Sequence, residues 1–295
     1  MTHKNLTITV DGGASGCRFA AFDANGALHA STESGPASLS LGAKQAWNNI
    51  KSGLALLAKE LGEPDDWLPH QLWMGLAGSL QRERYEQFMR LIPTTVTAVV
   101  VPDGHAQLIG ATKGRAGICL ALGTGSVIHW LDNSGNFGKA GGWGYPIGDE
   151  ASGAWLGTQL INQYLWFLDA STKNSTTPKL FTELEQHIGK SVSDIQAWST
   201  NTSSTRIASL APIVVKHADE DDALANRLLD KGANYCQQLI NLAPDDLPIY
   251  LVGGLANAYA SRLKTYYVNR CQPTHGNALD GLFTLSRNEL LIKHE

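Results

Sequence analysis

Four short apolar runs, each followed closely by glycine or aspartate, constrain the fold of this 295-residue chain more than any other feature. The runs are residues 6–10, 96–101, 117–122 and 249–252. Runs of about four to eight apolar residues between turn formers predict buried strands. In open α/β sheets, ligands bind beyond the carboxyl ends of the strands, so the residues after these runs are expected to serve one site.

Helical patterns separate the predicted strands. Residues 41–61 carry apolar side chains at three- and four-residue spacing, which predicts one apolar helix face. Further helices are predicted over residues 81–91, 151–168 and 223–243. Two strand–turn–strand units, over residues 8–30 and 127–136, start two similar halves. The pattern indicates an α/β protein with two lobes.

Length and composition narrow the classes of function. The chain is about twice the usual size of a single domain, so two domains are expected. A net charge of −4 does not favour nucleic-acid binding, and no segment is apolar enough to predict a membrane span. The start of the chain does not resemble a secretory signal, and the four cysteines are far apart without a C-x-x-C pair. These features predict a reduced, cytoplasmic protein.

Residues 11–16 (DGGASG) follow the first predicted strand. Consecutive glycines let backbone N–H groups approach phosphate oxygens closely, and the carboxylate of Asp11 can hold Mg²⁺ through water. A purely structural hairpin remains an equal alternative for this turn alone. Residues 123–126 (GTGS) follow the third strand and have the same chemistry, and the pair Gly253-Gly254 after the fourth leaves room for a flat nucleoside.

Asp103 stands at the end of the second predicted strand. A carboxylate there can accept the proton of a hydroxyl that attacks the γ-phosphate of ATP. The alternative is that Asp103 is the N-cap of a helix that starts at His105. Both roles can coexist.

Residues 141–153 (GGWGYPIGDEASG) form the most distinctive segment. Its glycines, Trp143 and Asp149 can place an aromatic ring and a carboxylate beside a sugar. Asp149 is also a candidate N-cap for the following helix. Ligand binding is favoured over a purely structural role.

Taken in this order, the motifs resemble the actin-like ATPase and sugar kinase superfamily, in its BadF/BadG/BcrA/BcrD-type ATPase branch. They look most like the bacterial glucosamine kinases and N-acetylglucosamine kinases of that branch. Additional segments that resemble these kinases are residues 34–42, 197–199, 206–212 and 273–279. The resemblance covers essentially the whole chain. It implies two actin-like (ribonuclease H-like) lobes, residues 1–112 and 113–295, around an interdomain ATP cleft, with the last helix packing back on the first lobe.

The resemblance also implies roles for single residues. Asp103 would be the catalytic base and Asp11 the residue beside Mg²⁺. The predicted ATP-binding residues are Gly12, Gly13, Ser15, Gly123, Thr124, Gly125, Gly253 and Gly254. The predicted sugar-binding residues are Gly78, Ser79, Ser126, Gly142, Trp143 and Asp149. The implied reaction is ATP-dependent phosphorylation of the 6-hydroxyl of an amino sugar, with glucosamine ahead of N-acetylglucosamine and with a possible homodimer.

Departures from the family pattern bear mainly on the substrate. Ser38 stands about where the family usually has asparagine, so recognition of an acetyl group is in doubt. Gly104-His105 replaces an alanine-rich helix start, and Asn277 is inserted in the last motif. Catalytic groups are retained.

Two other classes of function remain as rivals. An ATPase that activates a dehydratase or reductase through a shared iron–sulfur cluster needs accessible cysteines. Cys119 lies in a predicted buried strand, and Cys236 lies on a predicted helix without a companion cysteine. A non-catalytic sugar sensor would be expected to lose Asp103 or Asp11, and both are present.

Overall fold

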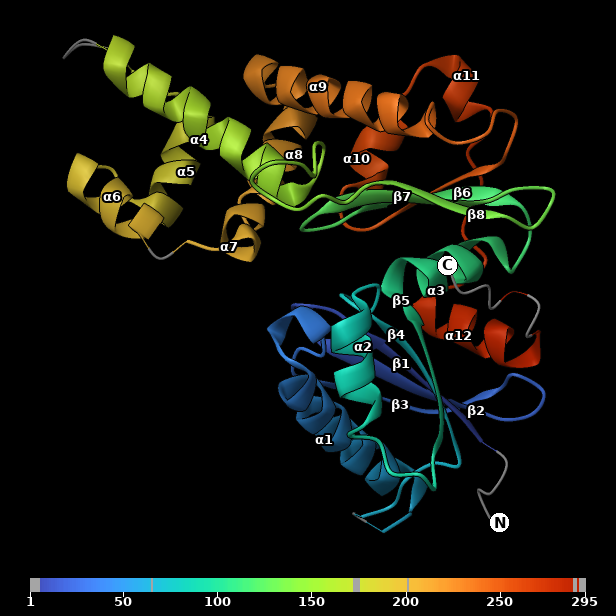
Figure 1. Cartoon of the computed structure of the whole chain (residues 1–295). Coiled ribbons are helices and arrows are strands. Elements are labelled where there is room, and N and C mark those ends of the chain that lie inside the picture. The colour runs from blue at the N-terminus through green and yellow to red at the C-terminus, as the bar shows by residue number, and fades with distance from the viewer. Residues whose placement is uncertain (1–5, 65, 172–175, 201, 289–290, 292–295) are drawn as a thin grey trace. The chain divides into compact units, whose positions relative to one another are not determined.

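The computed structural model describes residues 6–64, 66–171, 176–200, 202–288 and 291, and its elements are labelled in Figure 1. These residues form a mixed α/β fold with two sheets, and the chain divides into two units. Unit 1 consists of Met1–Gly117, Leu131–Phe137 and Pro273–Glu295. Unit 2 consists of Ile118–Trp130 and Gly138–Gln272.

Unit 1 contains a five-stranded sheet in the order β3-β2-β1-β4-β5. Its strands are β1 (Thr7–Gly12), β2 (Cys17–Phe22), β3 (Leu28–Ser34), β4 (Gln71–Leu76) and β5 (Thr97–Pro102). The β1–β2 and β2–β3 pairs are antiparallel, whereas β1 pairs with β4 and β4 with β5 in parallel. Strand β4 was not among the predicted strands. Its sequence, QLWMGL, has no β-branched residue and contains a glycine, so it lacks a strand signature.

Helices cover both faces of this sheet (Figure 1). They are the 3₁₀ helix η1 (Leu39–Leu41), α1 (Ala43–Leu61), α2 (Arg82–Met89), α3 (Asp103–Thr112) and α12 (Ala278–Arg287). Helix α1 packs on one face, where Phe19 of β2 and Ile50 of the helix belong to the same buried core cluster. Helices α3 and α12 pack on the other face and against each other. Asn277 and Asp280 start α12 with a reciprocal capping box.

The second sheet lies mainly in unit 2 and has the order β8-β7-β6-β9. Its strands are β6 (Gly117–Leu122), β7 (Ser126–Leu131), β8 (Phe137–Gly141) and β9 (Ile249–Val252), and β6 pairs with β9 in parallel. Strands β6 and β9 have the predicted bounds, while β1 and β5 are displaced by one or two residues.

Both predicted hairpins are confirmed, as β2–β3 and β7–β8. Each turns on an aspartate whose carboxylate accepts two backbone N–H groups. Asp23 accepts from Asn25 and Ala27, and Asp132 accepts from Ser134 and Asn136. The same turn chemistry in both hairpins supports the two-halves interpretation of the sequence.

Unit 2 also contains most of the helices. They are α4 (Gly153–Ala170), α5 (Lys179–Ile188), α6 (Val192–Thr200), α7 (Ser204–Ala208), α8 (Ala211–Asp219), α9 (Ala223–Ile240), α10 (Ala256–Ala260) and α11 (Thr265–Val268). Asp222 caps α9 by accepting the N–H groups of Leu224 and Ala225. In the part of the chain that the structure describes, no helix has the length and apolar character needed to cross a membrane.

Candidate functional site: a pocket in unit 2 and a carboxylate edge in unit 1

The carboxyl edge of the unit 1 sheet gathers several predicted site residues. Strands β1, β4 and β5 run in parallel, so their carboxyl ends meet at one edge. Asp11 and Gly12 end β1, and Asp103 follows β5 directly. Gly78 and Ser79 come two and three residues after β4. The register places Gly12, Leu76 and Pro102 side by side across the three strands.

Asp11 forms an ion pair with Arg18, its direct partner across the β1–β2 hairpin. The Arg18 side chain is half exposed, whereas that of Asp11 is mostly buried. The guanidinium contacts Oδ2 of the carboxylate. The sequence analysis did not identify this pairing, because it follows from strand register and not from a motif.

Asp11 is suited to a magnesium ion that arrives with a nucleotide. Among the described residues, no three His, Cys, Asp or Glu side chains gather into a group that could hold a metal. Magnesium in phosphoryl-transfer sites is usually bound by one or two carboxylates, with the remaining ligands from substrate phosphates and water. One carboxylate beside a phosphate turn fits that pattern.

The first glycine turn, between β1 and β2, is tightly tied to its surroundings. The Gly13 N–H donates to the Gly16 carbonyl at 2.9 Å, and the Gly13 carbonyl accepts from Ala37 and Ser38. A side chain at Gly12 would lie 2.6 Å from Leu76 Cδ2, so the close packing of this turn requires glycine. Ser15 is exposed at its tip.

The loop after β4 lies against the loop that precedes α1. The Ala77 N–H donates to the Gly12 carbonyl, and the Leu39 N–H donates to the Ala77 carbonyl. Gly78 has a φ of 81° and leaves no room for a side chain beside Ser40. The buried Oγ of Ser79 has no hydrogen-bond partner among the described residues. It is therefore a candidate contact for a polar ligand atom.

Asp103 is the first residue of α3, and its side chain is exposed at the sheet edge. The N-cap is Pro102, which provides no side-chain cap. The alternative in which Asp103 caps a helix starting at His105 is therefore wrong, because the helix begins two residues earlier.

In unit 2, the second glycine turn joins β6 to β7 and supports the start of α4. The carbonyls of Gly123 and Thr124 accept the N–H groups of Gly153 and Ala154. A Cβ on Gly125 would lie 2.5 Å from Oδ2 of Asp149. The second glycine turn and the 141–153 loop are therefore in direct contact.

Hydrogen bonds hold the 141–153 loop in place. The Ser126 hydroxyl donates to the Glu150 carbonyl at 2.6 Å, and the Gly142 N–H donates to the Ser126 carbonyl. Asp149 accepts the Gly144 N–H through Oδ1. Trp143 is 81% exposed, so its ring is open to a ligand or to solvent.

The loop also differs from one expectation. The N-cap of α4 is Ser152, whose hydroxyl accepts the Trp155 N–H, so the prediction of Asp149 as N-cap is wrong. Asp149 has a φ of 63° and turns back into the loop. Partial burial, reinforced by the nearby Glu150 charge, raises the pKa of the Asp149 carboxyl above its usual range.

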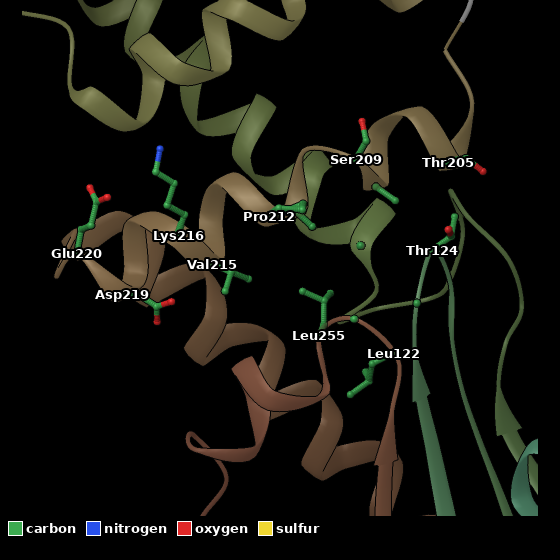
Figure 2. A pocket seen from close by; sticks show the side chains of 15 residues that line it. Leu122, Thr124, Thr205, Ser209, Pro212, Val215, Lys216, Asp219, Glu220 and Leu255 are labelled. Atoms are coloured by element: carbon green, nitrogen blue, oxygen red, sulfur yellow. The ribbon is translucent and has the colours of Figure 1, made fainter. Parts of the chain in front are cut away.

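A pocket of about 800 Å³ opens at the carboxyl ends of β6 and β9 (Figure 2). Leu122, Pro212, Val215 and Leu255 give it apolar walls. Polar groups come from Thr124, Thr205, Ser209, Lys216, Asp219 and Glu220. This size and mixture are typical of a site for a small organic ligand.

Three of the predicted ATP-binding residues, Gly123, Thr124 and Gly254, line this pocket. Gly253 has a φ of 98°, and a Cβ there would lie 2.4 Å from the Leu122 carbonyl, so β9 can turn here only with glycine. Gly254 faces open space. Helices α7 and α8 supply the opposite wall, which the sequence analysis did not assign. In the sequence, this wall was indicated only by the resemblance of residues 206–212 to glucosamine kinases.

Comparison with known proteins identifies the family. The model of the BadF/BadG/BcrA/BcrD ATPase family matches residues 8–274. The chain belongs to this family. It is 29% identical to glucosamine kinase GspK of Vibrio cholerae over 230 residues, which cover 78% of this chain and 77% of GspK.

The folds of solved structures are consistent with membership of this family. A Chromobacterium violaceum protein with the provisional name N-acetylglucosamine kinase superposes with a TM-score of 0.87 at 32% identity, covering 96% of this chain and 99% of that one. A ROK family glucokinase from Streptomyces griseus, solved with glucose and AMPPNP, superposes at 0.59 with 17% identity, covering 96% and 99% of the two chains. This BadF-type ATPase family member therefore has the actin-like fold of sugar kinases.

All four cysteines of this family member are free thiols. Burial raises the pKa of the Cys119 and Cys236 thiols to about 12, and the pKa of Cys17 is raised to about 12 chiefly by the same effect. Cys271 is partly buried, and its pKa is also raised. Among the described residues, none of these thiols belongs to a group of three or more potential metal ligands.

Proposed function

We propose that this protein transfers the γ-phosphoryl group of ATP to the 6-hydroxyl of an amino sugar, with glucosamine as the first candidate substrate and N-acetylglucosamine as the second. The observation that carries the proposal is the unit 2 pocket, since Gly123, Thr124 and Gly254 of two separate glycine motifs line one cavity. The names of the relatives in both comparisons support an amino sugar as the acceptor.

The pocket suits a nucleoside. Its apolar walls can hold a flat base, and Thr205 and Ser209 line the α7–α8 side, where the Ser209 hydroxyl donates to the Arg206 carbonyl. The turn at Gly123–Gly125 adjoins the pocket and exposes backbone to phosphates. We assign the adenosine of ATP to this pocket and its phosphates to the two glycine turns, including Gly13 and Ser15.

Asp103 is the proposed base. Its carboxylate accepts the proton of the sugar 6-hydroxyl as O6 forms a bond to the γ-phosphorus. The bond from that phosphorus to the bridging oxygen breaks, and ADP leaves. Asp11 would hold Mg²⁺, which supplies neutralisation of the phosphate charge when bound.

The sugar contacts that we propose are the six residues named above as sugar-binding. Two have features that support this role. Ser79 has a buried hydroxyl oxygen without a partner in the described structure, and Asp149 holds a carboxylate in the anchored 141–153 loop. The Ser38 hydroxyl donates to the Ala77 carbonyl and accepts the Ser40 N–H, so it is already engaged within unit 1. This supports glucosamine over a substrate that needs a donor from Ser38 to an acetyl group.

The test is a coupled assay of ADP release with Mg·ATP and a panel of sugars. The panel contains glucosamine, N-acetylglucosamine, glucose, mannose and N-acetylmannosamine. Turnover that is fastest with glucosamine supports the full proposal, and preference for N-acetylglucosamine would overturn the order of the two candidates. ATP binding without turnover on any sugar would favour an ATPase activator or a sugar sensor.

A further inference from the structure

Gly75 lies near the carboxyl end of β4, which stands between β1 and β5 in the unit 1 sheet. In the register of the sheet it is the direct neighbour of Asp11 on one side and of Val101 on the other. Residues in register on neighbouring strands project to the same face. A side chain at position 75 would therefore lie on the face that carries Asp11.

Helix α3 packs on this face with almost no clearance. A Cβ at position 75 would lie 2.9 Å from Cβ of Ala106, 3.6 Å from Cα of Asp103 and 3.7 Å from Cδ1 of Leu282. Two carbons pack best at about 3.5–4.0 Å, so only the contact with Ala106 is too short. Ala106 is fully buried and lies one helical turn after Asp103.

A glycine inside a strand weakens the strand and is typical of a place where another backbone comes close. Here the backbone that comes close is the first turn of α3, which begins with Asp103. Strand β5 leads directly into that turn, so the position of Asp103 depends on how deeply α3 sits on β4. Gly75 is thus in register with Asp11 on one side and packs beneath the first turn of α3.

We infer that Gly75 is a positioning residue for phosphoryl transfer, because the absence of its side chain lets α3 hold Asp103 at the correct height above the sheet. The inference rests on the proposed function, in which Asp103 is the base. It assigns Gly75 no contact with ATP or sugar.

The test is Gly75→Ala, measured with the sugar that the wild-type protein phosphorylates. A displacement of a catalytic group by about 1 Å can lower turnover roughly a hundredfold, and we expect a loss in kcat of that order. KM for ATP should change much less than kcat, because the proposed adenosine pocket belongs to unit 2 and Gly75 to unit 1. Adding Ala106→Gly removes the colliding methyl group and should restore most of the lost turnover. Ala106→Gly alone should be close to wild type.

The matched control is Gly53→Ala on α1. Its new methyl group would meet the Phe19 ring at 2.2 Å, on the opposite face of the same sheet. This variant should lose stability without a selective loss of kcat in the folded protein, as followed by thermal unfolding.

The outcomes for the Gly75 variants test the positioning role of Gly75 and can be told apart from a failure of the Asp103 assignment. Wild-type turnover in folded Gly75→Ala, or a folded double variant as slow as Gly75→Ala, would overturn the inference. If Gly75→Ala does not fold, the folded double variant decides alone: high turnover supports the inference and low turnover overturns it. A kcat of Asp103→Asn within tenfold of the wild type would instead refute the base assignment, and inactivity of the wild type on every sugar would refute the proposed function.

Discussion

Replacing Asp103 by asparagine should separate catalysis from stability. A positioned general base contributes about 10²- to 10⁴-fold to rate, which corresponds to about 3–5 kcal/mol in the barrier. The side chain is exposed at the first position of α3, and the N-cap residue is Pro102. Loss of its charge near the helix N-terminus is expected to cost about 0.3–1 kcal/mol of stability through the helix dipole. We expect kcat to fall by two to four orders of magnitude in a protein that unfolds almost like the wild type.

The assay pairs ADP release with urea unfolding and with direct titration of ATP. ATP affinity should change little, since the proposed adenosine pocket belongs to unit 2 and Asp103 is not among the proposed ATP-binding residues. Glu83→Gln is the matched control, because Glu83 also lies in the first turn of a unit 1 helix without a proposed catalytic role. It should show a similarly small change in stability and normal turnover. A kcat of Asp103→Asn within tenfold of the wild type, or a fall matched by Glu83→Gln, would refute the role of Asp103 as base.

Three further substitutions test other parts of the site and fold. Gly254→Leu should raise KM for ATP at least tenfold without unfolding the protein, because the new side chain enters open space in the pocket; unchanged ATP titration would count against the pocket assignment. The pKa of the Asp149 carboxyl is raised, so the carboxylate is protonated as the pH falls through that pKa, and KM for the sugar should then rise. The Asp149→Asn variant lacks this carboxylate, so its KM for the sugar should be high and should not change over the same pH range. The raised pKa also means that the charged form of Asp149 destabilises the fold at pH values above that pKa. Thermal unfolding at pH 8 should therefore show Asp149→Asn to be no less stable than the wild type. Asp222→Ala removes the two hydrogen bonds that cap α9 and should cost about 1 kcal/mol in urea unfolding, and no loss would contradict the cap.

Residues distant in sequence explain most of what sequence analysis missed. Strand β4 was overlooked because its burial, and not its residue types, makes it a strand. Asp103 was considered as a cap because an aspartate before a helix is common, whereas Pro102 allows α3 to begin at Asp103 itself. At Asp149 the same local rule failed, since Ser152 is the residue that meets the free N–H of Trp155.

The amino-acid sequence by itself determined the features that arise within a few residues. Apolar runs ending in glycine located β1, β5, β6 and β9, and asparagine- and glycine-rich turns located the two hairpins, because backbone preferences and burial patterns act locally. Only the tertiary structure decided which distant groups meet. It paired Asp11 with Arg18, set Gly75 beneath α3, and placed α7 and α8 across the pocket from β6. The physical reason is that these contacts depend on strand register and helix packing, which no local stretch of the chain contains.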